Sequence, residues 1–142
     1  MLSWATAIST HSGNGRKIIW RFVQTLNPAF KIRLLPDRII IVWRYESKTG
    51  QPPAQDYQQM NLLEDMLEPM IENGHFATLA LVSTGEGLRE WTYYAKSGDD
   101  FMDRLNIALR AKPAFPIEVH VASDPTWGMY YEFRAGVSDK VN

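Results

Sequence analysis

The chain has 142 residues, of which 45% are hydrophobic and 22% are charged, a composition that excludes disordered and fibrous proteins. Its 15 Lys and Arg residues against 16 Asp and Glu leave a formal charge of -1, which disfavours a nucleic-acid or anionic-lipid partner. There is no cysteine, so disulfides, thiolate catalysis and cysteine-based metal sites are excluded.

We expect one domain over residues 1–142: a hairpin and connector at 1–36, a core at 37–123, and a short helix and tail at 124–142. The first ten residues, MLSWATAIST, contain neither a basic segment nor a long apolar one. No apolar run approaches the roughly 18 residues that span a membrane. The sequence therefore predicts a cytoplasmic protein, and it does not indicate the oligomeric state.

Two β-type segments open the chain, at Ser3 to Thr10 and at Lys17 to Val23. Both are rich in β-branched and aromatic residues, and Asn14-Gly15 between them favours a tight primed turn. These features predict an N-terminal β-hairpin. The prolines in the following stretch, Leu26 to Asp37, favour an irregular connector.

The segment from Ile39 to Tyr45 predicts a central strand, because its seven residues are mostly β-branched or aromatic. Beyond Asp56, a candidate N-cap, apolar residues recur at steps of three and four. This spacing predicts an amphipathic helix with Tyr57, Met60, Leu63, Leu67 and Ile71 on its apolar face. Pro69 predicts a bend near Glu68, and Asn73-Gly74 would end the helix.

The stretch from Thr78 to Ala95 predicts a second hairpin, with its turn at Thr84 to Gly87. A short connection between twisted strands requires positive φ, so we expect it at Gly85 or Gly87.

A second helix is predicted to open at Gly98-Asp99-Asp100 and to run to Lys112. A half-buried strand follows at Ile117 to Val121, where apolar and polar residues alternate. Asp124 and Pro125 then resemble an N-cap and first helical residue, which predicts a terminal helix at Pro125 to Phe133. Trp127 and Tyr130 should pack inward from one face of that helix.

From Arg38 onward the predicted order is strand, helix, strand, strand, helix, strand. This order predicts an α+β fold with a ferredoxin-like, four-stranded antiparallel sheet and two helices on one face. The N-terminal hairpin would either extend the sheet edge or cover part of the open face.

Three segments together resemble a bacterial family of domains of unknown function, numbered 695. They are Leu63-Glu64-Asp65, the hairpin from Thr84 to Tyr94, and Asp124 to Trp127 with Tyr130. The resemblance spans nearly the whole chain and implies a small α+β domain without an established activity. The family is more distantly similar to the regulator of ribonuclease activity B group, whose members act by binding a ribonuclease rather than by catalysis.

No residue pattern in the chain predicts a cofactor, a metal ion or a catalytic residue. His11, His75 and His120 lack paired ligand spacing, and Gly85-Glu86-Gly87 lacks the Lys and Ser or Thr of a phosphate-binding loop. No nucleophile elbow of the form GxSxG occurs.

Strand alternation identifies one candidate binding surface. If Trp91 and Tyr93 face the core, polar and aromatic side chains share the opposite, open sheet face: Arg44, Glu90, Tyr94, Glu118 and His120. This set is either a solvated sheet face or a recognition surface.

Three classes of function follow. The favoured one is a non-enzymatic protein-binding or regulatory module, because a compact domain without catalytic residues can act by contact alone. The second is a single-stranded RNA binder that stacks bases on central-strand aromatics: Trp43, Tyr45, Trp91 and Tyr93. The third is a small enzyme with a site around Glu90, Glu118 and His120.

Overall fold

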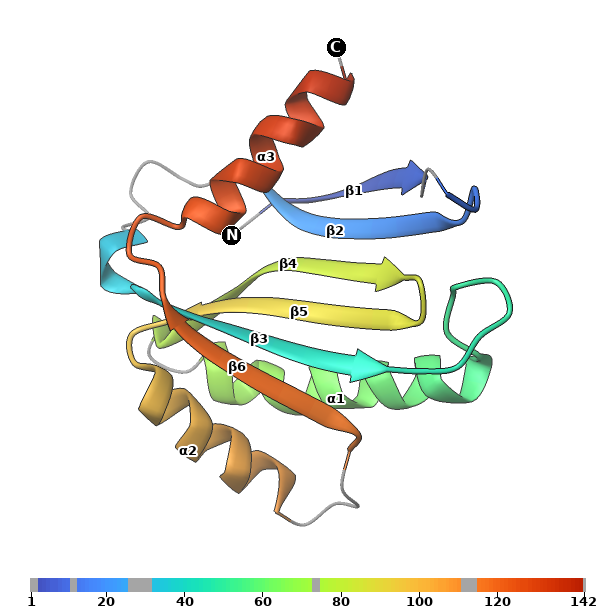
Figure 1. The fold of residues 1–142 in the computed structure, drawn as a ribbon. Coiled ribbons are helices and arrows are strands. Elements are labelled where there is room, and N and C mark those ends of the chain that lie inside the picture. Colours follow the sequence, from blue (N-terminus) through green and yellow to red (C-terminus); the bar gives the residue numbers. More distant parts are fainter. Residues whose placement is uncertain (1–2, 11–12, 26–31, 73–74, 111–114, 142) are drawn as a thin grey trace.

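The computed structural model describes residues 3–10, 13–25, 32–72, 75–110 and 115–141 (Figure 1). Its elements, in chain order, are β1 (Ser3–Thr10), β2 (Lys17–Thr25), the 3-10 helix η1 (Ile32–Leu34), β3 (Asp37–Arg44), α1 (Ala54–Glu72), β4 (Ala77–Gly85), β5 (Leu88–Ala95), α2 (Gly98–Leu109), β6 (Ile117–Ser123) and α3 (Gly128–Val141).

The strands form a six-stranded sheet in the order β1-β2-β4-β5-β3-β6, and all neighbouring strands are antiparallel. Helices α1 and α2 cover one face of the sheet, and α3 lies on the other (Figure 1). The α+β class is therefore confirmed. The four-stranded ferredoxin-like sheet is not, because two further strands belong to the same sheet.

The N-terminal hairpin extends the sheet rather than covering it. Strand β2 pairs with β4, with Ile19 opposite Thr84 and Phe22 opposite Leu81. Strand β1 is consequently one edge of the sheet, and β6 is the other.

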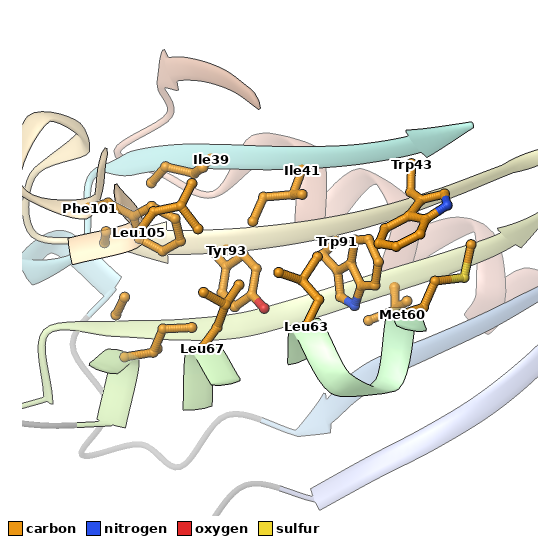
Figure 2. Packing of buried hydrophobic residues seen from close by; sticks show 14 of the residues in the cluster. Ile39, Ile41, Trp43, Met60, Leu63, Leu67, Trp91, Tyr93, Phe101 and Leu105 are labelled. Carbon is orange, nitrogen blue, oxygen red and sulfur yellow. The ribbon is translucent and has the colours of Figure 1, made fainter. Parts of the chain in front are cut away.

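The main core lies between the sheet and the two helices on its first face. Figure 2 shows Ile39, Ile41 and Trp43 of β3 and Trp91 and Tyr93 of β5 directed toward apolar residues of α1 and α2: Met60, Leu63, Leu67, Phe101 and Leu105. Alternation along each strand produces this row, because every second side chain faces the helices. The RNA-stacking hypothesis is therefore wrong for its four aromatics, since Trp43, Tyr45, Trp91 and Tyr93 are all buried.

A second, smaller core fills the space under α3. It contains Val23, Leu35, Ala80, Tyr94, Trp127 and Tyr130. The Trp127 and Tyr94 rings stack with centroids 4.1 Å apart, and the Trp127 indole donates to the Leu35 carbonyl at 2.9 Å. The prediction that Trp127 and Tyr130 pack inward is confirmed. Trp127 lies just before α3, however, with a φ of 55°.

The start of α1 differs from the prediction, whereas α2 begins at Gly98 as predicted. Helix α1 begins at Ala54, because the Tyr57 amide already donates to the Pro53 carbonyl, so Asp56 lies inside the first turn rather than at the cap. Ser97 caps α2, accepting from the Asp100 amide at 3.2 Å. Pro69 lies inside α1, and the bend expected near it stays a prediction.

Helix α3 begins at Gly128 rather than Pro125, because the Asp124 carboxylate accepts from the amides of Gly128 and Met129. It also extends to Val141, past the predicted end at Phe133. The predicted helix ends at Asn73-Gly74 and at Lys112 lie outside the described residues.

The turn of the β4-β5 hairpin has Glu86 at φ 55° and Gly87 at φ 75°, which confirms positive φ at Gly87. Gly85, the other of the two candidates, does not have positive φ. A side chain at Gly85 would come within 2.8 Å of the Lys17 carbonyl oxygen, so this glycine lets β2 approach β4 closely.

Candidate functional site

All five residues of the predicted open face lie on the sheet face opposite α1 and α2, since their neighbours Trp91 and Tyr93 point into the main core. Arg44 and Glu118 form an ion pair at 3.3 Å, and His120 lies 3.5 Å from the same carboxylate. These three side chains are exposed, and Glu90 is half-buried.

Tyr94 was expected on the open surface but is completely buried. The Trp127 ring stacks on it, and its hydroxyl donates to the Asp124 carboxylate at 2.8 Å. The residues before α3 therefore cover this end of the sheet, which strand alternation alone does not reveal.

The charged side chains on the exposed part of this face are paired with one another. Arg44 holds the pKa of Glu118 below its usual value through a hydrogen bond and its charge. Water screens such an exposed pair, so it stores little energy for binding or catalysis. A binding role for Arg44, Glu90, Glu118 and His120 stays a prediction.

A more structured site lies on the other face, in a hollow that we call the α1–β2 cleft. It has a volume of about 380 Å³, and its walls come from α1, from the loop before it and from strands β1, β2, β4 and β5. The lining residues are Thr6, Ile19, Arg21, Gln51, Tyr57, Asn61, Glu64, Val82, Thr84 and Arg89.

The fold creates this cleft because α1 packs over the central strands while the β1-β2 hairpin extends the sheet beyond the helix. Tyr57, Asn61 and Glu64 follow one another at steps of four and three along α1, so they form one flank of the helix. That flank faces the uncovered surface of the hairpin.

Glu64 connects three elements at the cleft. Both of its carboxylate oxygens accept from the Arg21 guanidinium of β2, and Oε1 also accepts from the Trp91 indole of β5 at 2.9 Å. Burial alone would raise the pKa of Glu64, but the hydrogen bonds and charge of Arg21 and the Trp91 hydrogen bond outweigh it and lower the pKa. Glu64 is therefore a fixed carboxylate that already has its cation.

Arg89 is the unusual residue of the cleft. It is only 6% exposed, and its Nε donates to the Thr84 hydroxyl at 2.8 Å. The guanidinium lies over the Tyr57 ring at 5.1 Å and the Trp91 ring at 5.7 Å. Among the residues that the structure describes, no carboxylate forms an ion pair with it.

Burial lowers the pKa of Arg89, as does the positive charge of Arg21, while Tyr57 and Glu64 act in the opposite direction. An arginine remains charged under such conditions, and buried charges in proteins are normally paired. The cleft thus contains one positive charge that no described carboxylate neutralises directly.

Exposed apolar side chains border the cleft. They are Trp4, Ile19 and Tyr57. Arg21 lies over the Trp4 ring at 5.6 Å, and a second hollow of about 220 Å³ shares Arg21 and Glu64 with the cleft and continues along α1 to Glu68 and Ile71. The combined surface is longer than the cleft alone.

The sequence prediction of site residues missed Arg21, Glu64 and Arg89. One signal was available for Arg89, because alternation places it on the same strand face as Trp91 and Tyr93. An arginine in a core-facing row indicates either a buried ion pair or a ligand site. Arg21 had no such signal, since its pairing with α1 depends on the hairpin joining the sheet.

Within the described ranges, no group of three or more His, Asp and Glu side chains is arranged to hold a metal ion. None of the helices in those ranges is both long enough and apolar enough to cross a membrane.

Comparison with solved structures finds eIF4E-3 of Ascaris suum with the m7G cap, at 15% identity and a TM-score of 0.39, covering 80% of this chain and 68% of that one. It also finds eIF4E-3 of C. elegans in complex with the 4E-binding protein Mextli, at 13% identity and a TM-score of 0.39, covering 78% and 68%. A search among curated proteins finds no match. The profile of a family of unknown function, DUF695, matches residues 3–134, and the chain therefore belongs to that family.

Proposed function

We propose that this protein is a non-enzymatic binding module that contacts a partner protein through the α1–β2 cleft. The observation that carries the proposal is the buried guanidinium of Arg89, which lines the cleft without a carboxylate partner among the described residues. A regulatory role, as the resemblance to the regulator of ribonuclease activity B group implies, would be a specific form of this function.

The composition of the surrounding surface supports a protein partner. Tyr, Trp and Arg are enriched at protein interfaces, because they offer large contact areas together with directed hydrogen bonds. The cleft and its border combine Tyr57, Trp4 and Arg21 with exposed Ile19.

We also infer that the chain acts as one domain, since β1 and β2 belong to the same sheet as the later strands. Strands β4, β5, β3 and β6 are adjacent in that order, and we interpret them with α1 and α2 as a ferredoxin-like unit that the hairpin enlarges.

A comparison of two tyrosine variants tests the proposed surface. Tyr57 at the cleft is 48% exposed and Tyr131 on α3 is 45% exposed, so Tyr57→Ala and Tyr131→Ala remove similar exposed area from opposite faces. Tagged wild-type protein and both variants are used to capture proteins from the host, and the bound proteins are quantified by mass spectrometry.

We expect at least one protein to be captured by the wild type and by Tyr131→Ala but lost, by about tenfold or more, with Tyr57→Ala. Equal recovery with both variants, or a selective loss with Tyr131→Ala, would show that the cleft is not the binding surface.

A further inference from the structure

We infer that Arg89 receives a carboxylate group carried by a peptide, supplied by either a free C-terminus or an Asp or Glu side chain. This inference rests on the proposed function and specifies the chemistry of the ligand at the same cleft.

The charges around the cleft favour a single negative charge. Arg21 and Arg89 contribute two positive charges, and Glu64 contributes one negative charge that is bonded directly to Arg21. The remaining charge of +1 matches a carboxylate. A phosphate dianion would carry a second charge that the cleft does not neutralise, and Glu64 would repel it.

The geometry of Arg89 also matches a carboxylate. Because Nε donates to Thr84 and the Tyr57 hydroxyl takes a further hydrogen bond, the remaining N–H groups of the terminal nitrogens are the part of the guanidinium that can meet a ligand. Those nitrogens form a planar fork, which suits the two oxygens of a carboxylate. The rings of Tyr57 and Trp91 hold the guanidinium in place before a ligand arrives.

Other polar groups in the cleft can complete the contact. The Asn61 amide and the Thr6 hydroxyl line the same hollow as Arg89. Both can donate a hydrogen bond to an oxygen that the guanidinium does not saturate.

NMR with small probes tests the inference without a known partner. The probes are N-acetylglycine, its uncharged amide, an amidated tripeptide with one central Asp, and inorganic phosphate. The reporters are the Arg89 Nε–H and the Trp91 indole N–H, both of which are hydrogen-bonded at the cleft. N-acetylglycine represents a C-terminus and the Asp peptide represents a side chain.

We expect saturable shifts of both reporters with at least one carboxylate probe, at a dissociation constant on the order of 1 to 10 mM for a single charged contact. The amide probe should produce none. Stronger binding of phosphate than of either carboxylate, or equal shifts with N-acetylglycine and its amide, would overturn the inference. This part of the test needs the wild-type protein and no variant.

Two charge-conserving variants then locate the contact. Arg89→Lys keeps the charge but loses the fork, and we expect it to weaken carboxylate binding about tenfold. Arg110→Lys, at the exposed C-terminal end of α2 and outside the cleft, should leave binding unchanged. Equal carboxylate affinities in the two variants, with folding verified by circular dichroism, would show that Arg89 does not contact the carboxylate.

The test of the carboxylate site and the test of the protein-binding surface can fail independently of each other. If the carboxylate probes do not bind but Tyr57→Ala still loses a captured protein, the cleft is a protein-binding surface and only the carboxylate inference fails. If the probes bind at Arg89 and no captured protein depends on Tyr57, the carboxylate site stands and the protein partner does not.

Discussion

The indole N–H of Trp91 donates to Oε1 of Glu64 at 2.9 Å, and the same carboxylate accepts from Arg21. A residue of the main core, a residue of α1 and a residue of the added hairpin are thereby joined at one point. This contact fixes the wall of the α1–β2 cleft nearest to Arg89.

Replacement of Glu64 by Gln should destabilise the fold by about 1 to 3 kcal/mol, because an amide cannot accept from Arg21 with both of its terminal atoms. Urea denaturation measures the change. Glu68→Gln, one turn later on α1 at an exposed position, is the matched control and should stay within about 0.5 kcal/mol of the wild type. A loss in the control equal to that in Glu64→Gln would mean that α1 responds to any loss of charge.

The lowered pKa of Glu64 also predicts a pH dependence. Its contribution to stability is fully present above its unfolded value, near 4.5, and is lost as the pH falls through the lower value of the folded state. The free energy of unfolding should therefore decline below about pH 4.5 more steeply for the wild type than for Glu64→Gln. Parallel curves for the two proteins would contradict this assignment.

Asp124 ties α3 to the sheet. Its carboxylate accepts from the Tyr94 hydroxyl, from Arg38 and from the amides of Gly128 and Met129. Asp124→Asn should cost about 1 to 3 kcal/mol, because one of its oxygens becomes a donor facing other donors. Thermal unfolding compares it with Asp103→Asn at an exposed site on α2, which should be nearly neutral. Equal melting temperatures for the two variants would exclude Asp124 as a structural link.

Three glycine variants separate conformational strain from crowding. Gly87→Ala should cost about 1 kcal/mol or more, since φ is 75° and the new Cβ would lie 3.0 Å from the Tyr45 carbonyl oxygen. Gly85→Ala should also destabilise, because its Cβ would approach the Lys17 oxygen within 2.8 Å. Gly136→Ala in α3, where nothing lies within 4 Å, should stabilise by up to about 1 kcal/mol. Urea and thermal denaturation should rank the stabilities of the three variants in the same order. Destabilisation by Gly136→Ala would contradict this prediction.

Removal of the Trp127 side chain should lower the free energy of unfolding strongly. Trp127→Ala deletes a fully buried ring and its hydrogen bond to Leu35, with an expected loss of about 3 to 5 kcal/mol. Trp4→Ala, where the residue is 38% exposed, serves as the comparison and should cost less than about 1 kcal/mol. A similar loss in both would mean that α3 is not anchored through Trp127.

Local patterns were sufficient for most of the strands and for the row of core residues. The alternation in β5 correctly placed Trp91 and Tyr93 on one face, and the structure shows that this face is the core. The register of β2 against β4 could not be predicted, since it depends on contacts between residues far apart in the sequence, such as Ile19 with Thr84. The α1–β2 cleft depends on that register.

The same limit applies at the C-terminal end. Asp124 was predicted as a helix cap next to Pro125, and its carboxylate does accept from amides of the helix start. The helix nevertheless does not begin at Pro125. The Trp127 ring first packs on Tyr94 and fills the space between that residue and α3. The burial of Tyr94 thus depends on a contact with a distant segment, and the alternation of residues in one strand cannot predict it.

Photo-crosslinking tests most directly whether the α1–β2 cleft is the binding surface. A benzophenone amino acid is placed at Tyr57 in one protein and at Tyr131 in another, and both are irradiated in the host. We expect a crosslinked partner from position 57 and none from position 131. A partner crosslinked from position 131 alone, or equally from both positions, would contradict it.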